Sequence, residues 1–299
     1  MGILTSPRAG TFRHLAHSPG ASAAIFQPKA HRQERPIPLT ATKTVLLPTA
    51  KPGLLDGATV FLDIDGTLLE LADDPAAVHA DAGTRILLSD LAQRLEGRLS
   101  LVSGRSLEQI DQIIGPIAQA LPVTGSHGLE YRWNGVWARP ERLPVLEDVA
   151  EAFATLAHIW PGCLVEEKSF GVAFHWRLAP DARDPAQALA VHLANEHALK
   201  IQHGKDLVEL RMPGGDKGQA VRRLMARPGM VGTQPVFFGD DLTDEAGFAA
   251  ARALGGHGVL VGERARDGSS TAATLSLASP AAVRALLRAF ADAPAGLAE

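Results

Sequence analysis

The sequence contains very little cysteine, since Cys163 is the only one in 299 residues. A single cysteine excludes an internal disulfide and a cysteine-rich metal site, and it fits a protein of the reducing cytoplasm, where we expect this chain to act. The sequence also lacks any apolar run near the roughly 20 residues that a membrane-spanning helix needs. Its net charge of -4 gives no basic excess of the kind that binds nucleic acid. We therefore expect a small-molecule partner, and neither a membrane nor a nucleic acid.

The first 52 residues have almost no acidic side chains and no periodic pattern. They hold seven Lys or Arg, three His and one acid, Glu34, spread among Pro, Ala, Ser and Thr. A segment without helical or strand periodicity offers no apolar face for packing. It also lacks the apolar core of a secretory signal. We predict that residues 1–52 form a disordered arm.

From residue 58 onward, short apolar runs alternate with helical patterns. One predicted helix, 84–95, carries Leu87, Leu91 and Leu95 on a single stripe. Such alternation is typical of a doubly wound α/β fold, in which a parallel sheet has helices on both faces and ligands bind beyond the carboxyl ends of its strands. The predicted strands are 59–63, 99–103, 121–124, 236–239 and 258–262.

The composition changes between residues 130 and 212. All four tryptophans and the only tyrosine, Tyr131, fall in this window, together with alternating runs such as 172–177 that predict strands. The strand and helix pattern of the sheet then resumes. We therefore predict a second, inserted domain at 130–212, between the two parts of a core domain at 53–129 and 213–299.

The run 61–67 ends a predicted strand with two acids, a glycine and a threonine. Because side chains alternate along a strand, Asp63 and Asp65 leave it on the same side, about 7 Å apart along the chain. Two such carboxylates can share a hard cation such as Mg²⁺, which a carboxylate needs if it is to attack a dianionic phosphate. The pattern favours metal-assisted phosphoryl transfer, although the same residues also fit a helix cap followed by a turn.

Three further stretches supply what the two aspartates would require. Ser103 follows a predicted strand and can donate a hydroxyl hydrogen bond to a phosphate oxygen. Lys217 begins a predicted helix, where backbone N–H groups also favour an anion. Asp240 and Asp241 follow another strand and so arrive at the same sheet edge as Asp63. Each stretch alone fits a cap, a solvated charge or a turn, but together and in this order they predict a phosphate site.

These stretches resemble the motifs of the haloacid dehalogenase superfamily of phosphatases, over roughly residues 59–290. The insertion resembles the C2-type cap of that superfamily, which implies a Rossmann-like core with an inserted α+β cap domain. Within the superfamily the chain is similar to the trehalose-6-phosphate phosphatases, although Trp176 stands where that family usually has tyrosine. The segments that carry this similarity are 125–130, 165–168, 174–177, 204–205, 208–209 and 239–245.

The resemblance implies an enzyme of trehalose biosynthesis that hydrolyses trehalose 6-phosphate through an aspartyl phosphate, with Mg²⁺ as cofactor. Asp63 would be the nucleophile and Asp65 the general acid and base, while Ser103 and Lys217 would stabilise charge on the transferring oxygens. The metal would be held by Asp63, Asp240 and the backbone carbonyl of Asp65, with Asp241 and Asp244 orienting its ligands. The residues expected to bind the substrate are Arg105, His127, Glu130, Glu166, Lys168, His175, Arg177, Lys205 and Glu209.

Three alternatives remain open from the sequence. The chain could act on sucrose phosphate or a hexose phosphate, which a panel of substrates would show. It could be a phosphosugar mutase, which shares the aspartyl phosphate but releases no phosphate. It could also be a non-catalytic sugar-phosphate sensor, although the presence of both Asp63 and Asp65 argues against that reading.

Overall fold

The computed structural model describes residues 47–72, 77–204, 206–262, 264 and 270–294. The chain divides into two compact units, residues 1–41 and 42–299, and all that follows concerns the second. Most of the predicted arm therefore lies outside the described residues. Within the described part, the helices are too short or too polar to cross a membrane.

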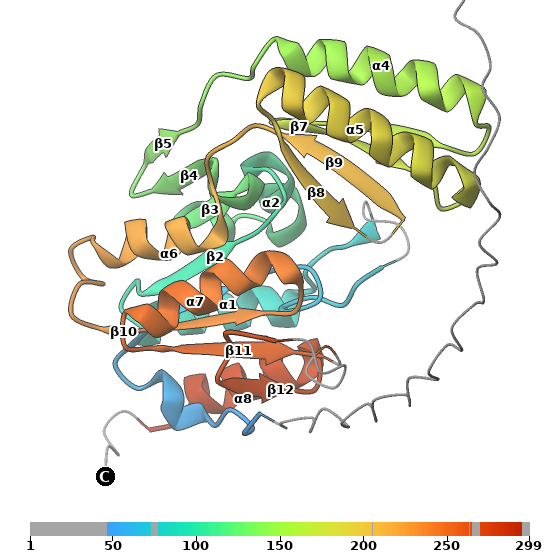
Figure 1. Cartoon of the computed structure of the whole chain (residues 1–299). Coiled ribbons are helices and arrows are strands. Elements are labelled where there is room, and N and C mark those ends of the chain that lie inside the picture. The colour runs from blue at the N-terminus through green and yellow to red at the C-terminus, as the bar shows by residue number, and fades with distance from the viewer. Residues whose placement is uncertain (1–46, 73–76, 205, 263, 265–269, 295–299) are drawn as a thin grey trace, which may run out of the picture. The chain divides into compact units, whose positions relative to one another are not determined.

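The core is built on a mostly parallel sheet whose strand order is β12-β11-β10-β1-β2-β3-β4-β5. The strands from β12 to β3 pair in parallel, whereas β4 and β5 add an antiparallel hairpin at one edge (Figure 1). The predicted doubly wound α/β fold is thus confirmed. The strands are β1 (Ala58–Leu62), β2 (Leu99–Val102), β3 (Val123–Gly125), β4 (Glu130–Trp133), β5 (Val136–Ala138), β10 (Gln234–Gly239), β11 (His257–Val261) and β12 (Leu275–Leu277).

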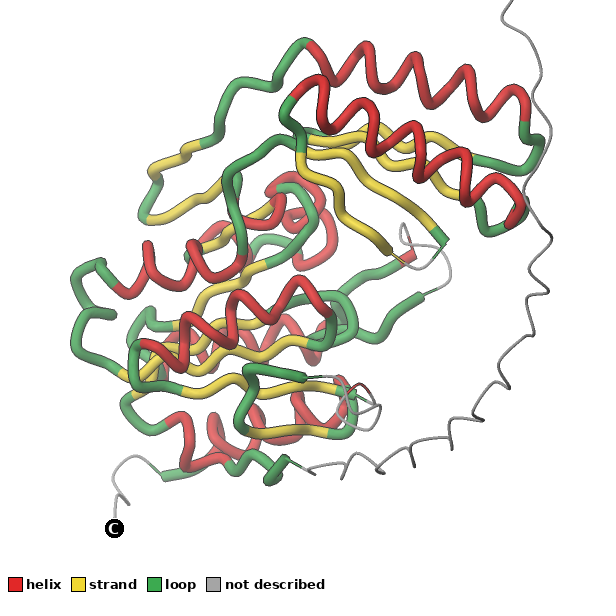
Figure 2. Tube along the Cα trace, viewed as in Figure 1, coloured by secondary structure: helices red, strands yellow, loops and turns green. Residues whose placement is uncertain are grey.

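Helices cover both faces of this sheet because its central strands are apolar on both sides. In β1, Val60 and Leu62 belong to one apolar cluster, and Phe61 between them belongs to another. Helices α1, α2, α3 and α8 pack in the first cluster, and α6 and α7 pack in the second (Figure 2). Their bounds are α1 (Ala82–Arg94), α2 (Leu107–Ile114), α3 (Ile117–Ala120), α6 (Lys217–Met225), α7 (Glu245–Ala253) and α8 (Pro280–Asp292).

The inserted cap domain is a four-stranded antiparallel sheet with two helices on one face (Figure 1). Alternate residues such as Val172 and Phe174 pack with both helices in a third apolar cluster. Residues between them therefore point to the other face of the sheet, away from the helices. The elements are α4 (Val145–Ile159), β6 (Leu164–Lys168), β7 (Gly171–His175), α5 (Arg183–His197), β8 (Lys200–Gly204) and β9 (Leu207–Arg211), with strand order β6-β7-β9-β8.

The inserted domain begins later than the predicted residue 130. Strands β4 and β5 pair with β3 in the core sheet, joined by a turn in which Asn134 and Gly135 have positive φ. Such a two-residue turn closes a tight hairpin. Trp133 and Trp137 therefore lie on core strands, and the aromatic residues did not mark one domain.

The folded core also begins earlier than the predicted residue 53. Ala50 is buried, and its N–H donates to the carbonyl oxygen of Ser276 at 3.1 Å. The Ser276 N–H in turn donates to the carbonyl oxygen of Pro48 at 2.9 Å. This segment is followed by a short 3₁₀ helix, Pro52–Leu55. Residues 48–50 thus lie beside β12 as part of the folded core.

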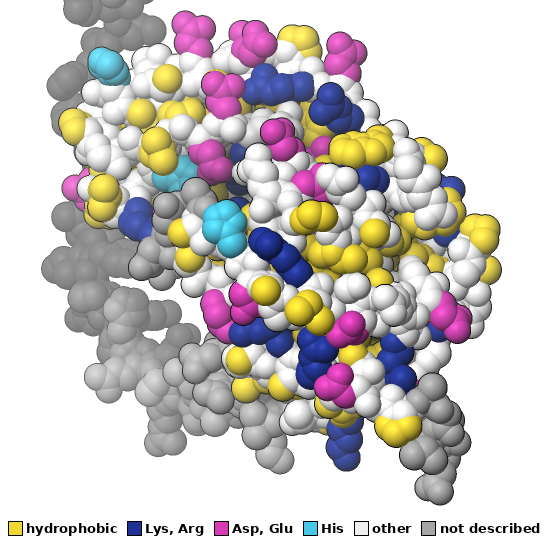
Figure 3. Space-filling model, turned by 180° about the vertical axis from the view of Figure 1, so that it is seen from behind, with side chains coloured by type: hydrophobic (Ala, Val, Ile, Leu, Met, Phe, Trp, Pro, Cys, Tyr) yellow, Lys and Arg dark blue, Asp and Glu magenta, His cyan; other side chains and the backbone are white. Residues whose placement is uncertain are grey.

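Over the face seen from behind, acidic and basic side chains are interspersed (Figure 3).

Candidate active site

The predicted catalytic residues meet at the carboxyl edge of the core sheet. Asp63 directly follows β1, Ser103 follows β2 and Asp240 follows β10, while Lys217 is the first residue of α6. Parallel strands all end at the same edge of the sheet, so residues about 40 to 180 positions apart in the chain lie together there, as expected for this kind of fold.

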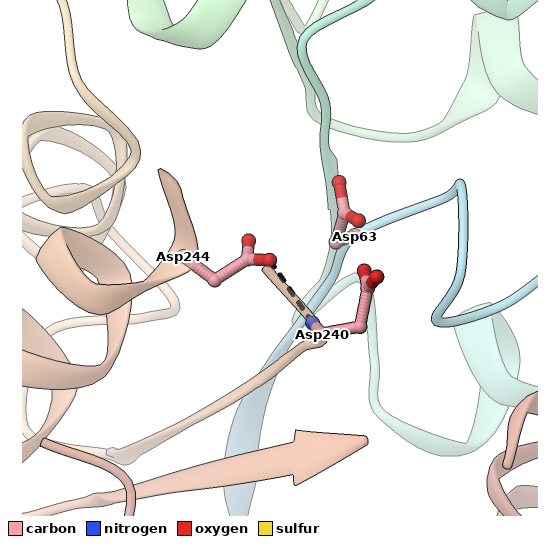
Figure 4. A group of neighbouring side chains, drawn as sticks. All are labelled: Asp63, Asp240 and Asp244. Carbon is pink, nitrogen blue, oxygen red and sulfur yellow. Dashed lines mark hydrogen bonds between the residues drawn. The ribbon is translucent and has the colours of Figure 1, made fainter. Parts of the chain in front are cut away.

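Three carboxylates face one another at this edge. One oxygen from each of Asp63, Asp240 and Asp244 lies within 4.8 Å of the others (Figure 4). Asp244 is placed by a 3₁₀ turn, Leu242–Asp244, and its Oδ2 accepts from the N–H groups of Asp240 and Asp241 at 3.0 Å. Oxygen ligands of this kind suit a hard divalent cation.

Electrostatics give the same indication. Burial raises the pKa of Asp240 to about 7, assisted by the negative charges of Asp244 and Asp241. Burial also raises the pKa of Asp63 and of Asp244, although Lys217 opposes both shifts. A cation between these three carboxylates would stabilise their ionised forms, which burial and mutual repulsion disfavour. The three residues therefore fit a metal ion.

Lys217 is buried between two of the carboxylates. Its Nζ donates to Asp63 Oδ1 at 2.8 Å and to Asp244 Oδ1 at 2.7 Å, and its side chain is 3% exposed. Burial disfavours the charge, but the carboxylates of Asp244 and Asp63 outweigh this effect and raise the lysine pKa. Lys217 is therefore a fixed positive charge next to the candidate nucleophile.

The glycine and threonine that follow Asp65 shape the backbone around Asp240. Gly66 has φ +77°, and a Cβ at this position would collide with the carboxylate of Asp240. The Thr67 hydroxyl donates to Asp240 Oδ1 at 3.2 Å. The Asp-Gly-Thr sequence thus lets the chain turn closely around Asp240 and hold its side chain.

Asp65 does not join this cluster. Arg105 Nε donates to Asp65 Oδ2 at 2.7 Å, and Arg105 Nη2 donates to Asp65 Oδ1 at 2.6 Å. Ser103 is 1% exposed, and its hydroxyl oxygen accepts a hydrogen bond from the Arg105 N–H at 3.1 Å. In this conformation the guanidinium holds the predicted general acid, and Asp244 supplies the third carboxylate of the cluster.

Four predicted substrate-binding residues form two pairs on the cap face opposite to its helices. His175 Nε2 lies 2.9 Å from Glu166 Oε2, and Lys168 Nζ donates to Glu209 Oε2 at 2.6 Å. The hydrogen bond with His175 lowers the pKa of Glu166, and the charges of Lys168 and Arg105 add to this shift. The cap thus presents two oriented carboxylates, each with a nitrogen partner.

The other predicted substrate residues have different surroundings. Glu130 is 4% exposed, and its Oε1 accepts from the Leu107 N–H at 3.1 Å and from the Ser126 hydroxyl at 2.7 Å. These bonds satisfy the N-terminus of α2, so Glu130 has a structural role, and its predicted sugar contact stays a prediction. Arg177 is exposed, 4.0 Å from Asp206, and Lys205 lies outside the described residues.

Two residues that the sequence did not single out lie between cap and core. Arg211, on β9, is two positions from Glu209 and donates to the Gly215 carbonyl oxygen at 3.3 Å. Gln202, on β8, contacts His127 of the core. The alternation of strand residues could have found Arg211, because residues 209 and 211 share a face. A cavity of about 20 Å³ at this junction is lined by Gly104, Ser126, His127, Leu129, Lys168, Phe170, Gly171, Glu209 and Arg211.

Comparisons with known proteins agree with this geometry. The pattern of the Trehalose-phosphatase family matches residues 61–281. A probable trehalose-phosphate phosphatase of Sinorhizobium fredii is 37% identical over 212 residues, which are 70% of this chain and 79% of that protein. The trehalose-6-phosphate phosphatase of Escherichia coli is 34% identical over 224 residues, 74% of this chain and 84% of that one.

Solved structures show the same fold. The crystal structure of a trehalose-6-phosphate phosphatase related protein matches with a TM-score of 0.66 at 28% identity, over 78% of this chain and 96% of that chain. A haloacid dehalogenase-like hydrolase from B. subtilis matches with a TM-score of 0.55 at 16% identity, over 77% of this chain and 98% of that chain. The second likeness shows the fold alone.

Proposed function

The chain belongs to the trehalose-phosphatase family, and from this membership we propose that it hydrolyses trehalose 6-phosphate to trehalose and inorganic phosphate. The observation that carries the proposal is the cluster of Asp63, Asp240 and Asp244 around Lys217, beside a cap whose polar face carries paired carboxylates. The first part suits transfer of a phosphoryl group. The second suits a ligand with many hydroxyl groups, because ionised carboxylates accept hydrogen bonds from them.

The phosphoryl group would pass through Asp63. An oxygen of the Asp63 carboxylate attacks phosphorus, and the bond from phosphorus to the sugar oxygen breaks. Asp65 gives a proton to that oxygen, and it then takes a proton from the water that hydrolyses the aspartyl phosphate. Because Arg105 occupies both oxygens of Asp65 in this conformation, Arg105 has to release Asp65 before the first proton transfer.

Lys217 and Ser103 would act on charge and orientation. Lys217 fixes the attacking carboxylate by its 2.8 Å bond to Asp63 and carries a positive charge that offsets the phosphate charge. Ser103 has its hydroxyl at the end of β2, where it can donate to a phosphate oxygen.

We propose Mg²⁺ as the metal, held by Asp63, Asp240 and Asp244. The cation supplies charge neutralisation between the carboxylates and the incoming phosphate. The raised pKa of Asp240 supports a cation at this place, because a cation favours the ionised carboxylate in competition with a proton.

The cap would recognise the sugar and enclose it. The pairs Glu166–His175 and Lys168–Glu209 lie on the cap face that bears no helix. The positive charge of Arg105 in the core helps to lower the pKa of Glu166. A disaccharide between cap and core would exchange hydrogen bonds with these carboxylate and nitrogen groups through its hydroxyl groups.

One assay tests the proposal against the alternatives. Phosphate release would be measured for trehalose 6-phosphate, sucrose phosphate, glucose phosphate and mannose phosphate, each with Mg²⁺ and with a chelator. We expect the highest kcat/KM for trehalose 6-phosphate, and no turnover with the chelator. Preference for another substrate would replace the substrate assignment, isomerised sugar phosphate without free phosphate would indicate a mutase, and binding without turnover would indicate a sensor. We propose the cytoplasm, where a chain with one cysteine would stay reduced, as the place of this reaction.

A further inference from the structure

His127 lies in an unusual backbone segment that the mechanism above does not use. Ser126, His127 and Gly128 form a short 3₁₀ segment directly after β3, with positive φ values of 48°, 53° and 102°. Non-glycine residues seldom adopt this conformation, and such strain is kept only where the surroundings enforce it. The reason for this segment must therefore lie in its contacts.

The first set of contacts joins this segment to the Ser103–Arg105 loop of the core. The His127 N–H donates to the carbonyl oxygen of Ser103 at 3.1 Å, and the Ser126 N–H donates to that of Arg105 at 2.8 Å. The imidazole covers Gly104 between these two bonds, since a Cβ on Gly104 would lie 2.6 Å from His127 Nε2. The imidazole and the loop are thus held together as one unit.

The second contact joins the imidazole to the cap. Gln202 Nε2 lies 3.5 Å from His127 Nε2, and we take the amide to donate to the imidazole. This distance is longer than the roughly 3.2 Å of ordinary N–H hydrogen bonds, so the contact is weak in this conformation. Gln202 is the register partner of Glu209 in the antiparallel pair of β8 and β9. Directly opposed residues share a sheet face, so Gln202 lies on the polar face of the cap that carries Glu209.

The charge state of His127 suits this bond. Burial, together with the charges of Lys217, Arg211 and Lys168, lowers the pKa of His127 to about 3. The imidazole is then neutral near pH 7, so that one ring nitrogen can accept a hydrogen bond. Its Nδ1 is buried without a hydrogen-bond partner among the described residues.

We propose that His127 is a positioning residue, through which the cap residue Gln202 holds the loop that carries Ser103 and Arg105 in its working position. The inference rests on the proposed function, because it requires a substrate that engages the cap. When the cap closes on a disaccharide, Gln202 meets the imidazole, and the imidazole keeps Gly104 and its neighbours in place. The same closure of the cap then fixes the positions of the Ser103 hydroxyl and of the Arg105 guanidinium, which binds Asp65.

The test is a double-mutant cycle on kcat and KM with two substrates. The variants are His127→Asn, Gln202→Ala and the double variant. Asparagine tolerates a positive φ better than most residues, so His127→Asn removes the ring and not the backbone conformation. The substrates are trehalose 6-phosphate and p-nitrophenyl phosphate, a small aryl phosphate that has no second sugar for the cap. His203→Ala is the matched control, because His203 is the next residue on β8 and is exposed.

With trehalose 6-phosphate, we expect each single variant to lose roughly tenfold in kcat, and the double variant to lose no more than the worse single one. With p-nitrophenyl phosphate, Gln202→Ala should stay within about twofold of the wild type, as should His203→Ala with both substrates. His127→Asn should lose activity with both substrates, because the imidazole itself packs on the loop of Ser103. Thermal unfolding checks that each variant folds. Gln202→Ala, on an edge strand of the cap, provides the test even if His127→Asn is unstable.

Two results would overturn the inference. One is losses that add in the double variant, which would mean that the two residues act independently. The other is an equal loss with both substrates in Gln202→Ala, or no loss in that variant, which would leave His127 with a purely structural role. Failure of the proposed function would appear differently, since the wild-type chain itself would then release no phosphate from trehalose 6-phosphate.

Discussion

Replacement of Lys217 by methionine tests the electrostatic design of the site. The change keeps a long apolar stem but removes the ammonium group that bonds Asp63 and Asp244 at 2.8 and 2.7 Å. The side chains of these two aspartates are 6% and 0% exposed, so neither can regain water in place of the lysine. Removal of one partner from a buried ion pair costs roughly 3 to 5 kcal/mol of unfolding free energy, because the remaining charge is buried without compensation.

The pH dependence of this loss follows from the sign of the pKa shifts. Burial already raises the pKa of Asp63 and of Asp244 in the folded protein, and Lys217 acts in the opposite direction. Without Lys217 both values rise further. A carboxyl whose pKa is raised by folding binds protons more tightly in the folded state, so its cost appears as pH rises and fades as pH falls. The difference between the variant and the wild type should therefore be larger at pH 8 than at pH 5.

Urea unfolding at both pH values, with a chelator and with Mg²⁺, would measure these effects. Mg²⁺ should restore part of the stability at pH 8, because a cation that binds only the folded state stabilises it by mass action. Arg142→Met is the stability control, since its pair with Glu167 has side chains that are 30% and 63% exposed and should contribute at most about 1 kcal/mol. Phosphate release by Lys217→Met should fall by roughly a hundredfold or more. A variant as stable as the wild type at pH 8 with chelator, or one that keeps full activity, would refute the reasoning.

Three further predictions concern other parts of the chain. Asp63→Asn should lower kcat by roughly a thousandfold or more with an unchanged circular dichroism spectrum, because it removes the nucleophile and one metal charge, and near-normal phosphate release would contradict the aspartyl phosphate. A chain that starts at residue 53 should melt at a lower temperature than one that starts at residue 47, since only the longer one keeps the hydrogen bonds to Ser276, and equal melting temperatures would show that these bonds contribute nothing. Between pH 7 and pH 5, His127→Asn should lose less unfolding free energy than the wild type. Burial lowers the pKa of His127 in the folded state to about 3, so below about pH 6.5 the histidine is protonated mainly in the unfolded state, which costs the wild type up to about 2 kcal/mol at pH 5. Parallel pH profiles of the two proteins would disprove this.

The alternation of strands and helices was predictable because it depends on local patterns. Apolar runs buried on both faces, such as β1, and stripes at helical spacing mark the elements of a doubly wound sheet. Once the sheet is parallel, its strand ends must share an edge, so the meeting of Asp63, Ser103 and Asp240 followed from the sequence.

Other features depend on pairings that no local pattern records. The hairpin of β4 and β5 alternates like a cap strand, and only its pairing with β3 shows that it belongs to the core. The hydrogen bond of Glu130 to the N-terminus of α2 joins residues 23 positions apart. The ion pair of Asp65 with Arg105 joins residues 40 positions apart, and Asp244 reaches the carboxylate cluster only because a 3₁₀ turn folds it back.

The connections between core and cap differ in length. After β3 the chain first forms the core hairpin of β4 and β5 and only then enters the cap, whereas it returns from β9 directly through Gly214 and Gly215 to Lys217. The returning segment packs on the turn after β3, because a Cβ on Gly128 would lie 2.6 Å from the carbonyl oxygen of Asp216. A larger residue would separate these two backbones, whereas glycine lets them pack against each other. A movement of the cap therefore acts most directly on the short returning segment, and so on the start of the helix that holds Lys217, the charge that fixes the nucleophile.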